Sequence, residues 1–412
     1  MTYKVAGIDV HKKVLMVVVA EIQADRATWQ TQRQRFGTTT CELQRLSRWL
    51  REQGVEEAVM ESTAQYWKPV WYELEPYMRL QLAQAYSNRA PRGRKHDFKD
   101  AERLVRRLVA DELTLSFVPG PEQRAWRTMT RIRVQLVHDR VRIHNQLECL
   151  LEEMRLKLSS VVSDLLGVSG RRILQALAAG QTNAQKLAEL RDPRLHCNQQ
   201  QLVEALTGDP QPAHQQLLEL YLQRLQLIEE QIRQLDSMIA QALQPHQDAV
   251  ARLAEVPGFG VASAQLVIAE VGPQAGTFPS PGQLASWVGT CPGKQESAEQ
   301  NHSSRSAKGN KYLRRVLTEC AQAAVRTKGS HWQAVFRRLL PRLGYRQAIW
   351  ALAHRLCRMV WKILHEQIRF VEPAVASDTK AKRRRAQILV RHLRQLGYSV
   401  VINPVTPTAI AT

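Results

Sequence analysis

The chain has 412 residues, and its 58 Lys and Arg against 38 Asp and Glu give a net charge of +20 at neutral pH, with a pI of about 10.1. This length suits two or three domains with buried cores, and the ordinary hydrophobic fraction of 44% excludes a disordered basic tail. A positive charge of this size predicts a polyanionic partner such as a nucleic acid.

The cysteine pattern excludes two further classes. No C-x-x-C pair occurs, so neither a zinc site nor a disulfide framework is predicted, and a reducing cytoplasm is expected. The N-terminus opens directly on a strand pattern, and no long uncharged apolar run follows anywhere. We therefore expect a cytoplasmic protein that is neither exported nor embedded in a membrane.

The first 111 residues alternate between strand and helix patterns. Apolar alternation, turn residues and helical spacing together predict the order β-β-β-α-β-α-β-α. This order is typical of a mixed sheet flanked by helices and resembles the ribonuclease H-like arrangement. The expected strands cover 5–10, 14–20, 27–36, 57–60 and 80–86, and the expected helices begin after Thr38–Thr40, at Tyr66 and at Asp100.

Four carboxylates in this region are candidates for a metal site. Asp9 interrupts the apolar run 5–10, and Glu61 closes the run 57–60. A charge at the end of a buried strand needs a partner to offset its desolvation, and with Asp97 and Asp100 the set forms hard oxygen donors of the kind that hold Mg²⁺ or Mn²⁺. For Asp97 and Asp100 alone, capping of the helix that begins near Phe98 is the better interpretation.

Helical patterns dominate from residue 121 onward. A long Arg-rich helix is expected over 124–153, followed by a less regular helical stretch over 156–212. Apolar residues then recur at steps of three and four from Leu218 to Ile239. This pattern predicts either a short coiled coil or an amphipathic helix packed within its own domain, and the sequence favours neither.

The segment around Gly258 and Gly260 predicts a turn between two helices. A helix-hairpin-helix would use these glycines to bring backbone N–H groups close to a DNA phosphate. An ordinary turn between helices is an equally good interpretation.

A polar, serine-bearing loop is expected after residue 289, leading into a basic helix. It contains Ser297 and three further serines before residue 307, among basic residues that include Arg305, Lys308, Arg314 and Arg315. Taken alone, such a stretch is most simply a solvated loop whose basic side chains bind phosphate. The run Lys382–Arg385 predicts a basic tail that adds non-specific affinity for nucleic acid.

Together these segments resemble the IS110 family of transposases, the serine recombinases of prokaryotic insertion sequences. The N-terminal match comprises GIDVHKK, MEST and GRKHDFKDAERL. The C-terminal match comprises VPGFG, ASWVG and a stretch that runs from ES to KGN and LRR. The resemblance covers nearly the whole chain, with the motifs in the family's order on two unrelated domains.

The resemblance implies a role for five residues. The acidic tetrad of a RuvC-like domain falls on Asp9, Glu61, Asp97 and Asp100, and the nucleophilic serine falls on Ser297. The chain departs from the family pattern at Glu299, where a small residue is usual. This places an anion beside a site that receives phosphate.

The expected fold class is α+β: a ribonuclease H-like mixed sheet, then a helical and coiled-coil region, then a mostly α-helical C-terminal domain with a helix-hairpin-helix-like segment. The expected divisions are a RuvC-like domain over 1–120, a helical oligomerisation region over 121–247, a transposase domain with the serine over 248–375, and a basic tail over 376–412.

The expected reaction is cleavage and rejoining of donor and target DNA through a covalent phosphoserine, with Mg²⁺ at the tetrad. Gly258, Gly260 and the four basic residues around the serine loop would contact nucleic acid. The resemblance also implies a bridge RNA that selects sites, a dimer or tetramer, and a nucleoid-associated location. Two alternatives are a metal-dependent nuclease of the Holliday-junction resolvase type and a non-catalytic nucleic-acid-binding protein.

Overall fold

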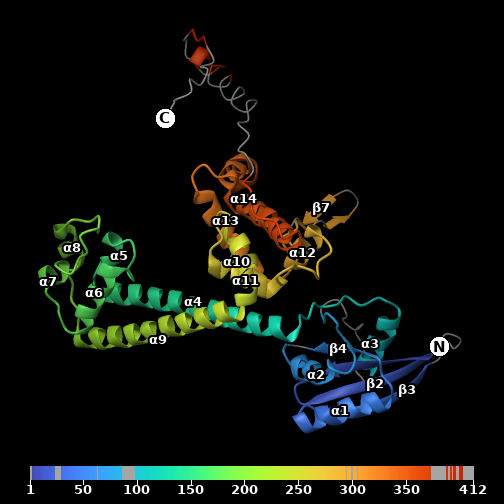
Figure 1. The fold of residues 1–412 in the computed structure, drawn as a ribbon. Coiled ribbons are helices and arrows are strands. Elements are labelled where there is room, and N and C mark those ends of the chain that lie inside the picture. Colours follow the sequence, from blue (N-terminus) through green and yellow to red (C-terminus); the bar gives the residue numbers. More distant parts are fainter. Residues whose placement is uncertain are drawn as a thin grey trace. The chain divides into compact units, whose positions relative to one another are not determined.

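The structure is a computed structural model with two compact units, Met1–Gly120 and Pro121–Thr412, each with its own hydrophobic core (Figure 1). The described residues are 2–23, 29–62, 64–85, 98–293, 295–297, 300–303, 305–372, 387, 390–391, 393–395 and 399–401.

A five-stranded mixed sheet forms the centre of the first unit, with the strand order β3-β2-β1-β4-β5. β1 pairs antiparallel with β2 and parallel with β4, and β5 continues the sheet in parallel beyond β4. Valine and isoleucine are frequent in β1 and β2, because β-branched side chains pack well on a pleated surface, and Ala58, Val59 and Met60 form the buried middle of β4. The strands are β1 (Thr2–Val10), β2 (Val14–Gln23), β3 (Gln30–Gly37), β4 (Glu57–Ser62) and β5 (Arg79–Leu82).

The three helices of this unit divide between the two faces of the sheet. α1 (Thr40–Glu52) and α2 (Trp67–Leu74) share a core with Ala6, Ile8 and Val10 of β1. α3 (Lys99–Val109) packs on the other face, where its Val105 meets Val5 and its Leu104 meets Val59. Since side chains alternate along a strand, Asp9 and Glu61 lie on the α3 face.

The observed order of elements and the α+β class are as the sequence predicts. The third strand begins at Gln30 rather than at residue 27, and β5 ends at Leu82 rather than at residue 86. Beyond Leu82 the chain continues only as an isolated antiparallel bridge between Ala83 and Leu115, so β5 is the short edge strand of the sheet.

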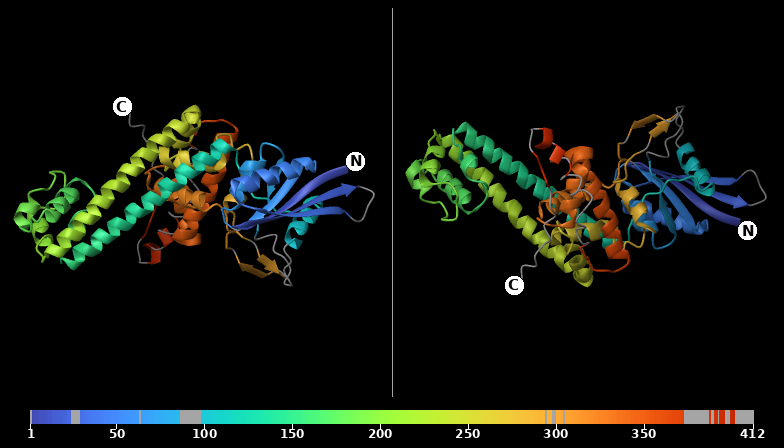
Figure 2. Two further views of the ribbon diagram at one scale, coloured as in Figure 1. Left: turned by 90° about the horizontal axis from the view of Figure 1, so that it is seen from below. Right: turned by 90° about the horizontal axis from the view of Figure 1, so that it is seen from above.

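Two long helices, α4 (Pro121–Glu153) and α9 (Pro212–Ala242), run side by side in the second unit (Figures 1 and 2). Four short helices lie at one end of this pair and share its core. They are α5 (Leu158–Val161), α6 (Val168–Ala178), α7 (Ala184–Ala188) and α8 (Gln199–Ala205).

The apolar seam of α9 is buried within a single chain. Leu218, Leu225, Ile228 and Ile232 join the same core cluster as Ile143 of α4. The structure thus accounts for these residues by packing within their own domain, which is one of the two interpretations that the spacing allows.

The remaining helices form a compact C-terminal group. α11 (Val261–Val271) lies at its centre and is buried from Ala264 to Val271, while α13 and α14 pack against each other beside it. α14 bends at Gly344, which has a φ of 71° three residues after Pro341. The other elements are η1 (Gln244–His246), α10 (Gln247–Ala254), α12 (Pro281–Val288), β6 (Gln295–Ser297), β7 (Gln300–Ser303), α13 (Lys311–Arg326) and α14 (His331–His365).

Among the described residues, no helix combines the length and the apolar character that crossing a membrane requires.

Candidate functional site

Asp9 and Glu61 are neighbours across two parallel strands. The register of β1 and β4 pairs Asp9 with Glu61 directly, so both side chains leave the sheet at the same level of the α3 face. Each carboxylate stands near the end of its strand, just beyond the apolar residues that bury the middle of the sheet. The sheet thus brings together two acids that lie 52 positions apart in the sequence.

Gly7 brings the start of α3 onto these two acids. A Cβ at this position would lie 2.2 Å from the carbonyl oxygen of Ala101, so only glycine permits so close an approach of helix to strand. Asp100 occupies the first turn of α3, beside Ala101. Its Oδ1 accepts a hydrogen bond of 2.7 Å from Nη1 of Arg103.

The electrostatics of Glu61 show that the three carboxylates act on one another. Burial raises the pKa of Glu61 above the ordinary carboxyl value; Arg103 opposes this shift, and the charges of Asp9 and Asp100 add to it. A carboxylate that is destabilised by burial and by two like charges is one that a cation would stabilise. Carboxylate oxygens are the type of donor that a divalent ion such as Mg²⁺ prefers.

The fourth predicted acid, Asp97, lies outside the described residues. The N-cap position of α3 is Phe98, whose side chain makes no capping hydrogen bond. Within the described part of the chain, no three His, Cys, Asp or Glu side chains are grouped closely enough to hold an ion. The described carboxylates therefore form only part of the predicted tetrad.

His11 contacts the same site from its solvent side. Its Nε2 lies 3.0 Å from Oδ2 of Asp9, and its side chain is 55% exposed. The imidazole therefore holds the Asp9 carboxylate from outside.

Ser297 lies on a short β-hairpin, where the sequence predicts a loop. β6 and β7 pair antiparallel, with Ser297 opposite Gln300 and Glu296 opposite Asn301. The hairpin extends away from the helices in Figure 1. Polar residues can form this ribbon because the two strands satisfy each other's backbone groups without a core. Ser297 is therefore the last residue of its strand, at the tip of the hairpin.

The base of the hairpin is closed by backbone contacts at glycines. A Cβ on Gly293 would lie 2.2 Å from the carbonyl oxygen of Arg305, and one on Gly309 would lie 2.2 Å from that of Val288. Gly289 ends α12 in the left-handed region at φ 78°, against Ala307. The segments before and after the hairpin are thus packed backbone to backbone.

Arg314 of α13 connects the two segments that flank the hairpin. Its Nη1 donates to the carbonyl oxygens of Gly289 and of Ala307, the latter at 2.8 Å. Its guanidinium also lies 4.5 Å from the ring centre of Trp350, whose Nε1 donates to Oγ of Ser306 at 2.9 Å. Arg314 and Trp350 therefore hold both sides of the hairpin's base.

The other predicted phosphate contacts are Arg305, Lys308 and Arg315, and all three side chains are exposed. Arg315 also donates to Oε1 of Glu319 at 2.6 Å.

The two predicted glycines also differ from each other. A Cβ on Gly258, which has a φ of 93°, would lie 2.3 Å from the carbonyl oxygen of Cys320, so this glycine permits close packing against α13. Gly260 is the N-cap residue of α11 and has no atom within 4 Å of its Cβ position. Of the pair, Gly260 is the one open to a ligand.

A buried ion network was not predicted. Glu270 of α11 is fully buried; Arg131 of α4 donates to both of its oxygens at 2.7 and 2.9 Å, and Arg127 lies 3.4 Å away. Asn310 donates to Glu270 at 2.7 Å while its Oδ1 accepts from the backbone N–H groups of Tyr312 and Leu313.

This network fixes the start of α13, directly after the serine hairpin, to α11 and α4. Burial lowers the pKa of Arg127 to about 10, so this arginine stays charged at neutral pH. Glu270 interrupts the apolar run LVIAEV, so the reasoning that selects Asp9 and Glu61 could also have found it.

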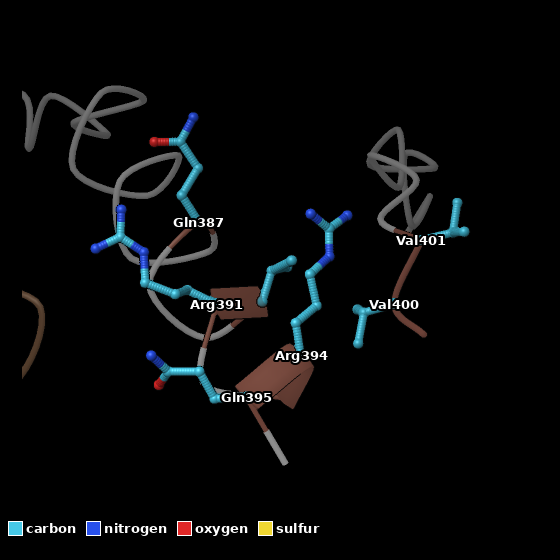
Figure 3. Close-up of a pocket in the computed structure, with 7 residues that line it drawn as sticks. Gln387, Arg391, Arg394, Gln395, Val400 and Val401 are labelled. Carbon is cyan, nitrogen blue, oxygen red and sulfur yellow. The ribbon is translucent and has the colours of Figure 1, made fainter. Parts of the chain in front are cut away.

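The C-terminal segment contains a shallow hollow in which two arginines gather (Figure 3). Among the described residues, its lining is free of carboxylates, so it adds positive charge and no metal ligand. The predicted basic run Lys382–Arg385 lies outside the described residues. The lining residues are Gln387, Val390, Arg391, Arg394, Gln395, Val400 and Val401.

Comparison with known families gives two matches on the chain. Residues 6–155 match the family model described as a DEDD transposase of the IS110 type, and residues 250–337 match that of the IS116/IS110/IS902 transposase family. The first match contains Asp9, Glu61, Asp97 and Asp100, and the second contains Ser297.

Two proteins are similar over most of the chain. A Pseudomonas aeruginosa protein named "Probable family 20 transposase" is 30% identical over 312 residues, which cover 74% of this chain and 82% of that protein. A Sinorhizobium fredii protein named as transposase y4pF/y4sB is 26% identical over 293 residues, which cover 69% of this chain and 65% of that protein.

Proposed function

Because the chain belongs to the IS110 family of transposases, we propose that it cuts and rejoins donor and target DNA through a covalent phosphoserine formed on Ser297. A transposase of this family with a RuvC-like domain acts on DNA, and the net charge of +20 suits that substrate.

The proposal divides the chain by task. The RuvC-like domain is residues 1–120, the helical oligomerisation region is 121–247, the transposase domain is 248–375 and the basic tail is 376–412. The separation of compact units after Gly120 supports the first of these boundaries.

The observation that carries the metal-dependent part is the in-register pair of Asp9 and Glu61 beneath the start of α3. With Asp97 and Asp100 these residues would hold Mg²⁺ or Mn²⁺. When bound, such an ion would neutralise the charge of a phosphodiester that is under attack. The raised pKa of Glu61 supports this assignment, because burial, and after it the charges of Asp9 and Asp100, destabilise the ionised carboxylate.

The strand exchange itself is a transfer between oxygens. The hydroxyl oxygen of Ser297 forms a bond to phosphorus as the bond from phosphorus to a sugar oxygen breaks, and the hydroxyl proton ends on the departing oxygen. The phosphoserine keeps the energy of the broken bond, so a sugar hydroxyl of another DNA end reverses the step and releases the serine. Arg305, Lys308 and Arg315 would stabilise charge on the phosphate; all three follow the hairpin closely in the sequence.

Site selection and assembly are proposed from the family resemblance. A bridge RNA would pair with donor and target DNA, which suits a basic protein that lacks a recognisable helix-turn-helix or zinc-finger sequence. A dimer or tetramer would complete the active site with domains of different subunits, in the prokaryotic cytoplasm and on the nucleoid.

Denaturing electrophoresis of labelled DNA after incubation with the protein and Mg²⁺ tests the proposal. A serine recombinase leaves protein covalently bound to the cut DNA, and Ser297→Ala removes the adduct. Free DNA ends formed by Ser297→Ala would instead favour a nuclease of the resolvase type. Binding without cleavage, by a protein with its expected RNA present, would favour a non-catalytic nucleic-acid-binding protein.

A further inference from the structure

The longest helix of the C-terminal group, α14, contains seven cations and no acid. Its 35 residues hold six arginines and one lysine, and all seven side chains are exposed. None of them forms an ion pair with another residue that the structure describes. The seven are Arg337, Arg338, Arg342, Arg346, Arg355, Arg358 and Lys362.

The basic residues of α4 are arranged differently. Five arginines of this helix each lie close to a carboxylate, Arg127 and Arg131 at the buried Glu270, and the other three at surface acids. Such charges are largely neutralised within the chain. Compared with α4, α14 therefore presents more positive charge that no described carboxylate neutralises.

Three of the cations form a row on one face of the helix. Arg355, Arg358 and Lys362 are spaced by three and four residues, so they lie above one another over a rise of about 10 Å. The opposite face, which includes Leu356 and Val360, is buried against the neighbouring helices. The row thus points to solvent from a rigid support.

The two tryptophans closest to this row are already engaged. Trp350 donates to Ser306 and stacks with Arg314, and Trp361 is buried and donates to the carbonyl oxygen of Phe278 at 2.7 Å. Unpaired bases are bound mainly by stacking on free aromatic rings. A straight row of cations without such rings suits the phosphate backbone of a duplex.

We propose that Arg355, Arg358 and Lys362 of α14 form a binding surface for the backbone of duplex DNA. The row begins about 7 to 8 Å along the helix axis from Trp350, the residue that holds the base of the serine hairpin. DNA that lies along the row is thereby directed toward the hairpin. This surface rests on the proposed function, and it lies apart from the basic residues of α13.

The test compares two variants with the same change in net charge. The first combines Arg355→Gln, Arg358→Gln and Lys362→Gln. The matched control combines Arg142→Gln, Arg194→Gln and Arg233→Gln, three exposed arginines that each pair with a nearby acid. Affinity for a labelled duplex of arbitrary sequence is measured over a series of salt concentrations, with single-stranded RNA of the same length as the second probe.

The row variant should bind duplex DNA with a shallower dependence of log affinity on log salt. The slope should fall by about 0.9 for each phosphate that the protein no longer neutralises, and by about 2.7 when all three cations are removed from the DNA backbone. The control should keep the wild-type slope. Arg355→Lys with Arg358→Lys should also keep it, since counterion release depends on charge, and this variant shows that a reduced slope does not reflect misfolding.

Three results would contradict the proposed DNA-binding surface. They are an unchanged salt slope in the row variant, equal losses of DNA affinity in both triple variants, or a loss of affinity for the RNA probe alone. The covalent adduct of the wild-type protein is scored separately. If the wild-type protein forms the adduct but the row variant keeps the wild-type slope, only the proposed α14 surface is rejected. If the row variant has a shallower slope but the wild-type protein forms no adduct, the phosphoserine intermediate is rejected and the α14 surface is supported.

Discussion

At the scale of single residues, the structure shows why acids stand in apolar runs. Asp9 and Glu61 become neighbours only when β1 and β4 pair. Ionisation of Glu61 in this position is unfavourable, as its raised pKa indicates. Glu270 has the same sequence character, but two arginines and an amide stabilise it fully. An acid whose pKa is raised by its surroundings, as that of Glu61 is, is therefore the better candidate for a metal ligand.

Glu61→Gln should raise the thermal stability of the metal-free protein. The ionised carboxylate destabilises the fold; this cost is complete above its raised folded-state pKa and is relieved as pH falls from there toward the ordinary value. At neutral pH the neutral amide removes the cost. Scanning calorimetry without metal should therefore show a higher melting temperature than for Glu52→Gln, an exposed change on α1.

Added Mg²⁺ should raise the melting temperature of the wild-type protein and have much less effect on Glu61→Gln, because ligand binding to the folded state stabilises it. A Glu61→Gln protein that is less stable than wild type without metal would contradict the electrostatic account of this site.

At the scale of elements, the hairpin that contains Ser297 depends on α12, α13 and α14 for its position. Arg314→Ala should slow formation of the covalent adduct by about 100-fold, the cost of a small displacement of a reacting group. It should leave the salt dependence of DNA binding unchanged, because Nη1 of Arg314 is engaged by carbonyl oxygens. Quench-flow measurement of the adduct, beside salt titrations of binding, checks both parts.

Trp350→Phe provides an independent check on the same base. It removes the hydrogen bond to Ser306 but keeps a ring beneath Arg314, so the loss of rate should be in the same direction and smaller. If Arg314→Ala instead lowered the salt slope by about 0.9, Arg314 would be a phosphate ligand.

Removing one partner from the buried Glu270 network should strongly destabilise the second unit. Glu270→Gln leaves Arg127 and Arg131 without their buried countercharge, and this type of change costs about 3–5 kcal/mol. Glu319→Gln, which removes an exposed partner of Arg315, should cost at most about 1 kcal/mol. Denaturant unfolding of both variants measures the loss in free energy of unfolding. Equal losses would show that the buried partner of Arg127 and Arg131 matters no more than an exposed ion pair.

Much of the first unit could be predicted because β1, β2 and β4 contain apolar runs with clear ends. The position of Ser297 on a hairpin could not, since residues 295–303 are polar and lack the alternation that marks a strand. The role of Arg314 was also hidden, because the same sequence suits a phosphate contact and a clamp on carbonyl oxygens. The contacts of Arg314 with carbonyl oxygens are visible only in the folded chain, because they join residues that are distant in the sequence.

At the scale of the whole molecule, the proposed function assigns affinity and chemistry to different residues. Basic side chains would supply the attraction to nucleic acid, and the carboxylates of the first unit would supply the metal-dependent chemistry. Asp9→Ala and Asp100→Ala should therefore abolish strand cleavage and rejoining while DNA affinity and its salt dependence stay close to wild type. Recombination by either variant at the wild-type rate in Mg²⁺ would show that these acids hold no catalytic metal.

The central claim is that Ser297 carries the DNA strand during exchange, and peptide mapping of a trapped adduct by mass spectrometry tests it most directly. The account predicts that the nucleotide remains on the peptide that contains Ser297, and that Ser297→Ala yields no adduct. A nucleotide on Ser303, Ser304 or Ser306, or Mg²⁺-dependent cleavage that leaves only free DNA ends, would contradict it.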